Sequence, residues 1–116
     1  MQSVNLISDA HFSDDKPNVL HAVKTDQQLV DGMYLKPGQR TGWRKISNED
    51  RAFVCIQGQG ELVLETSAVG NELRIPLAAG AVALAPRGIF HDLLAGPEGM
   101  VCSALSRFPV RVVEKG

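Results

Sequence analysis

Residues 80–91 read Gly80-Ala-Val-Ala-Leu-Ala-Pro86-Arg-Gly88-Ile-Phe-His91 and combine a strand, a tight turn and a histidine. The run 81–85 is short, apolar and bounded by turn residues, which is typical of a β-strand. Pro86 fixes one backbone angle of the following turn, and Gly88 relaxes the next one. His91 therefore enters a second predicted strand with a defined facing.

Size and composition limit the chain to one soluble domain. Its 116 residues match the usual domain size of about 100–150 residues. Hydrophobic residues make up 44%, yet every apolar run is too short to cross a bilayer. The net charge is -1, without a basic block that could follow a phosphate backbone. The start of the sequence has neither a basic leader nor a long apolar run, so we expect a cytoplasmic protein that binds neither membranes nor nucleic acid.

Short apolar segments separated by glycine-rich and proline-rich turns dominate the sequence after residue 18. Nine of them have the length and composition of strands: 19–23, 29–35, 52–56, 61–65, 72–75, 81–85, 91–94, 101–105 and 110–113. This spacing predicts an all-β domain, an antiparallel sandwich or barrel, over residues 18–116. Residues 1–17 are polar and lack a sustained period, which predicts an N-terminal arm.

A second motif lies upstream of the first, with the spacing Gly38-x5-Arg44-x-Ile46-x4-Arg51-x6-Gly58. Together the two motifs resemble those of the cupin family, G-x5-H-x-H-x4-E-x6-G and G-x5-P-x-G-x2-H. The resemblance implies a small RmlC-like jelly-roll β-barrel, or double-stranded β-helix, with a cavity between two sheets. Gly58 and Gly60 then resemble a hairpin between two barrel strands, where glycine permits positive φ. Gly96-Pro97 likewise predicts a turn.

The resemblance also implies a metal held by three histidines and one acidic residue, of which only His91 is matched. Arg44, Ile46 and Arg51 occupy the other three positions, and shifting the alignment by one residue restores no histidine. A protonated guanidinium has no lone pair to give a metal. We therefore expect no cofactor in the usual cupin site. An alternative site for a divalent transition metal would use His91, Glu49 and Cys55.

Arg51, and with it Arg44, can instead point into the mouth of the cavity. A guanidinium offers a planar fork that matches carboxylate or phosphate groups. Arg51 and His91 would then recognise a small anion, with His91 as a hydrogen-bond donor or proton relay. The alternative is that the arginines extend over the barrel surface or pair with acidic residues such as Glu49 and Asp92.

Other side chains are candidates for the cavity wall. Trp43 would roof the cavity or pack at the barrel rim, Phe53 would line the apolar floor, and Tyr34 would place its hydroxyl at the edge. Cys55 and Cys102 lack a C-x-x-C spacing. They are expected to be buried free thiols, with a cavity-facing ligand or nucleophile as the alternative.

Three functions are compatible with these residues. The first is binding of a small, anionic or apolar metabolite in the barrel without a metal. The second is a metal-independent isomerase, epimerase or lyase in which His91 is the acid or base and Tyr34, Asp92 or Glu49 supplies a second such group. The third is a dioxygenase-like metallo-cupin with a non-standard ligand set. His21 is expected to be structural rather than catalytic.

The arm also bears on the oligomeric state. Val4, Leu6, Ile7 and Phe12 offer apolar surface for edge pairing or strand exchange with a second subunit. Small single-domain cupins look commonly dimeric, so we expect a homodimer.

Overall fold

The computed structural model describes residues 2–66, 70–107 and 109–115, in which every regular element is a strand. Residues 1, 67–69, 108 and 116, which belong to the predicted arm and barrel, lie outside the described residues. The strands are β1 (Asn18–Lys24), β2 (Gln28–Leu35), β3 (Arg44–Ile46), β4 (Arg51–Glu65), β5 (Glu72–Ala78), β6 (Val82–Ala85), β7 (His91–Arg107) and β8 (Val112–Glu114). All their pairings are antiparallel. The predicted all-β fold is confirmed.

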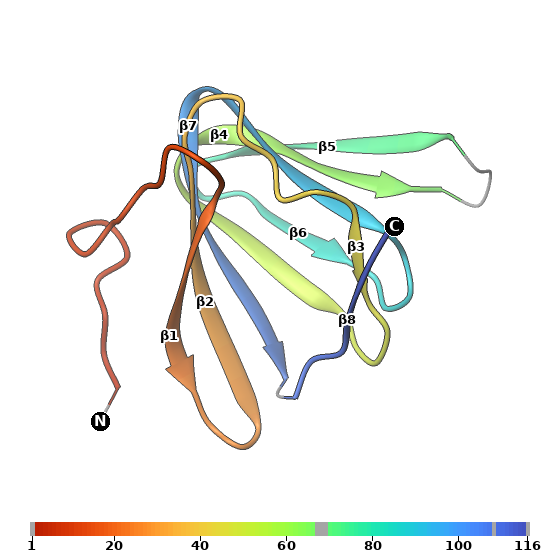
Figure 1. Cartoon of the computed structure of the whole chain (residues 1–116), viewed down its shortest axis with the longest axis horizontal. Helices are drawn as coiled ribbons and strands as arrows, with labels where there is room; N and C mark the ends of the chain where they lie inside the picture. Colours follow the sequence, from red (N-terminus) through yellow and green to blue (C-terminus); the bar gives the residue numbers. More distant parts are fainter. Residues whose placement is uncertain (1, 67–69, 108, 116) are drawn as a thin grey trace.

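Two long strands, β4 and β7, belong to both layers of the molecule (Figure 1). The first half of β4 pairs with β6 and with the second half of β7, whereas its second half pairs with β5 and with the first half of β7. β2 and then β1 extend the first layer from β7, while β3 and then β8 extend the second. The result is one sheet folded into a jelly roll.

The core lies between the two layers, where alternate residues of each strand point inward. Leu35, Phe53, Leu62, Leu93 and Cys102 are all fully buried and belong to one apolar cluster. Ile46, which stands at a metal-ligand position of the family motif, is also buried. Alternate residues of the predicted apolar segments therefore form the interior of the barrel.

The predicted hairpin at Gly58 and Gly60 is wrong, because both glycines lie inside β4. Gly96-Pro97 likewise lies inside β7 rather than in a turn. Each long strand joins two segments that the sequence pattern separates, and the pattern also missed the three-residue β3. Register shifts interrupt the β4–β7 ladder beside Gly58 and Gly60. A strand must bend sharply to pass from one layer to the other, and glycine and a bulge permit that bend. The glycines therefore mark a bend inside one strand rather than a turn between two strands.

The glycines of β4 are required because the backbone of β7 passes directly against them. A Cβ atom at Gly58 would lie 2.2 Å from the Gly99 carbonyl oxygen, and one at Gly60 would lie 2.2 Å from the Leu94 carbonyl oxygen. Gly58 also has a φ of 78°, which disfavours any side chain. Contact between the two backbones therefore sets the corner of the fold.

The arm, residues 2–17, contains no strand and folds back on its own chain. Its Leu6 carbonyl accepts a hydrogen bond of 2.8 Å from the Tyr34 hydroxyl. Phe12 packs edge-on against the Tyr34 ring, with the ring centres 5.5 Å apart. Gln2 exchanges hydrogen bonds with the backbone of Lys24 at the end of β1. The arm thus lies against the outer face of the first layer.

The described residues contain no helix that could cross a membrane.

Three glycine-to-alanine variants compare the stability cost of backbone strain, tested at Gly38, with the cost of steric overlap at the corner, tested at Gly58 and Gly60. Gly38→Ala meets nothing within 4 Å but has a φ of 77°, so it should cost about 1–2 kcal/mol in unfolding free energy. Gly60→Ala and Gly58→Ala must displace the β7 backbone and should cost more, about 3 kcal/mol or above. Urea unfolding measures the three values. Equal losses at all three positions would contradict the proposed backbone contact.

Candidate functional site

His91 begins β7 and points into the interior from the second layer. It is 2% exposed, and the strand ladder places it between Arg44 of β3 and the core residue Leu64 of β4. Its Nδ1 atom lies 3.3 Å from the Ile89 carbonyl oxygen. The ring of Phe53, from the first layer, meets the His91 ring edge-on with 5.7 Å between ring centres. The histidine is therefore held in an apolar wall beside an arginine.

Arg51 reaches the same region from the first layer, where it begins β4. It is 7% exposed, and its Nη2 donates a 2.7 Å hydrogen bond to Asp31 Oδ2. The other oxygen of Asp31 lies 2.6 Å from Nδ1 of His21, whose side chain is largely exposed. Asp31 itself is buried. The Asp31 carboxylate thus holds the Arg51 guanidinium in place. The contact of Asp31 with His21 agrees with the structural role predicted for that histidine.

Some buried polar atoms of this region have no partner. Among the described residues, the Nε atoms of Arg44 and Arg51 and the Oγ of Ser106 are buried without a hydrogen bond. Ser106 belongs to the same end of the barrel, because its neighbour Leu105 pairs with Ala52, the residue after Arg51. A buried donor without an acceptor costs about 1–3 kcal/mol and calls for an explanation.

His91, Arg51, Arg44 and Asp31 form a charged cluster in which groups of both signs act on one another. Burial lowers the pKa of His91, the charges of Arg51 and Arg44 lower it further, and the Ile89 carbonyl and Asp92 oppose the shift. Burial also lowers the pKa of Arg51, against the attraction of Asp31. Because a guanidinium stays protonated, the cluster holds two positive charges. Asp31 faces Arg51 directly, and the carboxylates of Glu49 and Asp92 also act on Arg51 and His91 respectively.

A pocket of about 140 Å³ lies beside Arg44, the one residue of the cluster that lines it. It is lined by Lys16, Pro17, Val19, Met33, Arg40, Thr41 and Arg44. Three of these side chains are basic and none is acidic. The loop at the rim is held by the fully buried Asp92, which accepts hydrogen bonds from Arg40, Thr41 and Gly42. Asp92 is therefore a positioning group for the pocket rather than a partner of His91.

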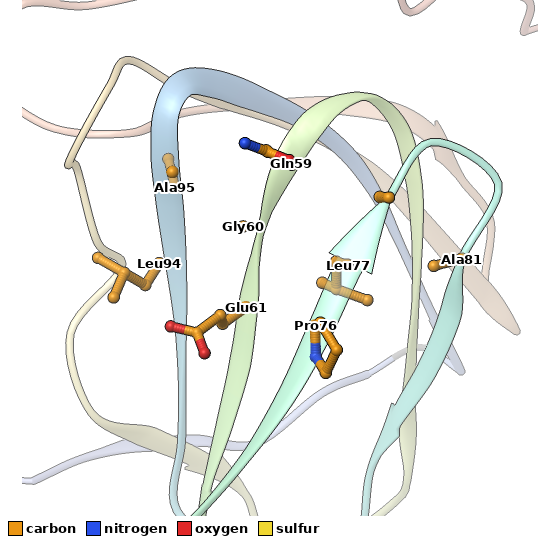
Figure 2. Close-up of a pocket in the computed structure, with 10 residues that line it drawn as sticks. Gln59, Gly60, Glu61, Pro76, Leu77, Ala81, Leu94 and Ala95 are labelled. Atoms are coloured by element: carbon orange, nitrogen blue, oxygen red, sulfur yellow. The ribbon is translucent and has the colours of Figure 1, made fainter.

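A larger pocket of about 520 Å³ lies by the bend of β4 and β7. Figure 2 shows Pro76 and Leu77 of β5 beside Gly60 and Glu61 of β4. The lining is mostly apolar, and Glu61 is its one charged side chain. This pocket does not suit an anion, and it contains none of the residues that the motifs single out.

The structure does not bring all the predicted wall residues to the cluster. Phe53 is there, but Tyr34 faces the arm on the outer side of the first layer. Trp43 packs under Lys115, whose Nζ lies 5.6 Å from the centre of the indole. Cys55 of β4 lies opposite Cys102 of β7 in the strand ladder, and burial raises the pKa of both thiols. Tyr34, Trp43 and Cys55 are thus absent from the charged cluster.

The residues present do not fit a metal. Glu49 accepts a hydrogen bond from the Arg107 backbone, and the Cys55 Sγ is 3.7 Å from the Gln57 carbonyl oxygen. In the ranges 2–66, 70–107 and 109–115, no three His, Cys, Asp or Glu side chains gather to hold an ion. His91, Glu49 and Cys55 therefore form no such group, and the other three ligand positions of the family motif hold Arg44, Ile46 and Arg51.

Solved structures support the fold assignment. No family model and no curated protein matches the sequence. The protein TT1209 from Thermus thermophilus superposes with a TM-score of 0.81 at 18% identity, covering 92% of this chain and 98% of its own. An uncharacterized conserved protein with a double-stranded β-helix domain from Klebsiella pneumoniae gives 0.81 at 19% identity, with 95% and 93% covered. An RmlC-like cupin protein from Desulfovibrio desulfuricans gives 0.76 at 24% identity, with 91% and 96% covered.

The chain is therefore a small cupin-fold domain, as its two motifs indicate. At these identities the likeness shows the fold alone.

Sequence reasoning missed Asp31, which holds Arg51. A signal was present, because Asp31 interrupts the apolar run Leu29-Val-Asp-Gly-Met-Tyr-Leu35 at a position that shares a strand face with Met33. A charged residue on a buried face needs a partner. The partner itself could not be named, since Arg51 lies 20 residues away.

Variants without Asp31 should show that its carboxylate compensates the buried charge of Arg51. Asp31→Leu leaves Arg51 buried without its counter-charge and should lower the unfolding free energy by about 3–5 kcal/mol. The double variant Asp31→Leu with Arg51→Met should recover most of that loss, because both charges are gone. Chemical denaturation measures both. A double variant no more stable than Asp31→Leu would contradict the pairing.

Acidification should destabilise the protein through His91. Because the folded-state pKa is below the ordinary value of 6.5, the unfolded chain takes up the proton first as the pH falls. The stability contribution is therefore complete above pH 6.5 and is lost as the pH falls toward the folded-state pKa. Urea unfolding between about pH 5 and 8 should show a flatter profile for His91→Gln. A slope in His91→Gln that equals the wild-type slope would contradict the assignment.

Proposed function

We propose that this protein binds a small organic anion inside the barrel, on Arg44, Arg51 and His91, without a metal. The observation that supports the proposal is the pair of buried Nε donors without a partner, one on each arginine. The arginines come from opposite layers and act on the same histidine electrostatically. An anionic oxygen between them would satisfy the donors and balance the charge.

The surroundings of the cluster favour a small carboxylate with a short apolar part. Asp31 occupies Nη2 of Arg51 and leaves its Nε for another acceptor. The Phe53 ring provides an apolar surface beside both Arg51 and His91. Charge-assisted hydrogen bonds would hold the acidic group, and the aromatic ring would exclude ligands that are polar throughout.

The basic pocket at the surface is the proposed entrance. Lys16, Arg40 and Arg44 all line it; the charge of Arg40 is paired with Asp92, whereas Arg44 also belongs to the inner cluster. A basic rim with low-dielectric walls raises the local concentration of anions and speeds their association. The charge of the pocket and that of the proposed site thus have the same sign.

Binding is favoured over acid–base catalysis because His91 lacks a titratable partner at hydrogen-bond distance among the described residues. Its Nδ1 faces a backbone carbonyl. The three candidates for a second acid or base are engaged elsewhere: Tyr34 with the arm, Asp92 with the pocket rim and Glu49 with the Arg107 backbone. The second acid or base of the isomerase or lyase hypothesis is therefore not beside His91.

Isothermal titration calorimetry with acetate, propionate, malonate and inorganic phosphate tests the proposal, with acetamide as the neutral control. We expect at least one anion to bind at about pH 6 and acetamide not to bind. Arg44→Gln should weaken binding about tenfold or more, whereas Arg74→Gln, an exposed arginine on β5, should not change it. Affinity should also rise as the pH falls, because the bound anion favours protonated His91. A folded protein that binds none of these anions would overturn the proposal.

A further inference from the structure

The outer face of the second layer carries two aromatic rings near its edge. Trp43 directly precedes β3, and Phe90 directly precedes β7. Arg44 and His91, the next residues of the two strands, are cross-strand partners on the inner face. Because successive residues of a strand point to opposite faces, Trp43 and Phe90 share the outer face. Both are partly buried, so their rings form an aromatic patch on the side away from the core.

Lys115 places its ammonium group against both rings. Its Nζ atom lies 5.6 Å from the centre of the Trp43 ring and 5.2 Å from the centre of the Phe90 ring. The same atom forms an ion pair with the carboxylate of Glu65, the last residue of β4. A cation within about 6 Å of a ring centre is attracted by the face of the ring. Trp43, Phe90 and Glu65 thus meet at one ammonium group, and we call these three residues the aromatic cage.

A second lysine shows what selects the occupant of the cage. The Nζ atom of Lys45, on β3, lies 4.9 Å from the centre of the Phe90 ring. Among the contacts of the described residues, it is Lys115 that joins both rings to the Glu65 carboxylate. The Phe90 ring by itself therefore attracts cations, whereas Trp43 and Glu65 add the second ring and the counter-charge at a single position.

The strand that carries Lys115 is held weakly. β8 lies at the edge of its layer beside β3 (Figure 1), and among the described strands it pairs with β3 alone. All three of its residues are exposed, and the Lys115 side chain is 42% exposed. Segments with few buried contacts and exposed backbone hydrogen bonds open at the lowest free energy. The Lys115 side chain can therefore leave the cage while the barrel stays folded.

We propose that the aromatic cage is a binding site for small organic ammonium ions, and that Lys115 is its tethered occupant in the free protein. An alkylammonium or quaternary ammonium ion takes the place of the Lys115 ammonium group between the rings, with Glu65 as its counter-charge. The displaced Lys115 side chain then returns to solvent. Arg44 and His91 lie on the opposite face of the layer, so this cation site is separate from the proposed anion site.

Fluorescence of Trp43, the one tryptophan of the chain, tests the proposal directly. Lys115→Ala empties the cage, so n-butylammonium, which imitates the lysine side chain, should change the emission with a dissociation constant of about 1–10 mM. The wild type should bind it about three- to tenfold more weakly, because the tethered lysine competes at a millimolar effective concentration or above. At constant ionic strength, tetramethylammonium should also bind the variant, whereas 1-butanol, the neutral analogue, should not.

Matched variants separate the cage from general cation binding. Lys45→Ala removes the other lysine at Phe90 but leaves Lys115 in place, so it should bind n-butylammonium as weakly as the wild type. In the Lys115→Ala background, Glu65→Gln and Phe90→Leu should each weaken binding about threefold, with circular dichroism as the check on folding. A folded Lys115→Ala protein whose emission responds to neither ammonium ion, or responds equally to 1-butanol, would overturn the proposal. Tight binding by Lys45→Ala would overturn it as well.

Discussion

Contact between the backbones of β4 and β7 is the constraint on which the rest of this structure depends. Both strands bend at the same corner, and Gly58 and Gly60 permit it because a Cβ at either position would overlap a carbonyl oxygen of β7. The bend divides each strand between two layers. It thereby places Arg51, at the start of β4, opposite His91, at the start of β7, so the charged cluster follows from the fold of the sheet.

The proposed anion site keeps donors that a simple ion pair would satisfy. Arg51 has one carboxylate partner, Asp31, whereas Arg44 has a backbone carbonyl, and each keeps a buried donor without an acceptor. Such an arrangement costs stability when nothing is bound. Functional sites commonly bear that kind of cost, because the same unsatisfied groups interact with the ligand. Under the proposed function, Arg44 and Arg51, which stand at two of the ligand positions of the family motif, would bind an anion.

Much of the fold could be predicted, and the failures have a common cause. Turn residues and apolar segments predict strands correctly, but the same glycines mark the bends inside β4 and β7, so two long strands were divided. Glycine signals a backbone that needs room or positive φ, and it does not say whether the chain reverses or continues. For the site, Arg51, Arg44, Phe53 and His91 were predicted together, while Asp31 was missed and Tyr34 was placed on the wrong face.

The sequence by itself determined the all-β class, the cupin-like spacing from Gly38 to His91 and the residues that stand at its ligand positions, because these are local properties of residue type and order. Only the tertiary structure decided what Arg51 pairs with, which donors are left unsatisfied and which apolar residues remain outside. Those outcomes depend on register between strands far apart in the chain. Since a shift of one residue turns a side chain to the opposite face, they could not be read from the spacing alone.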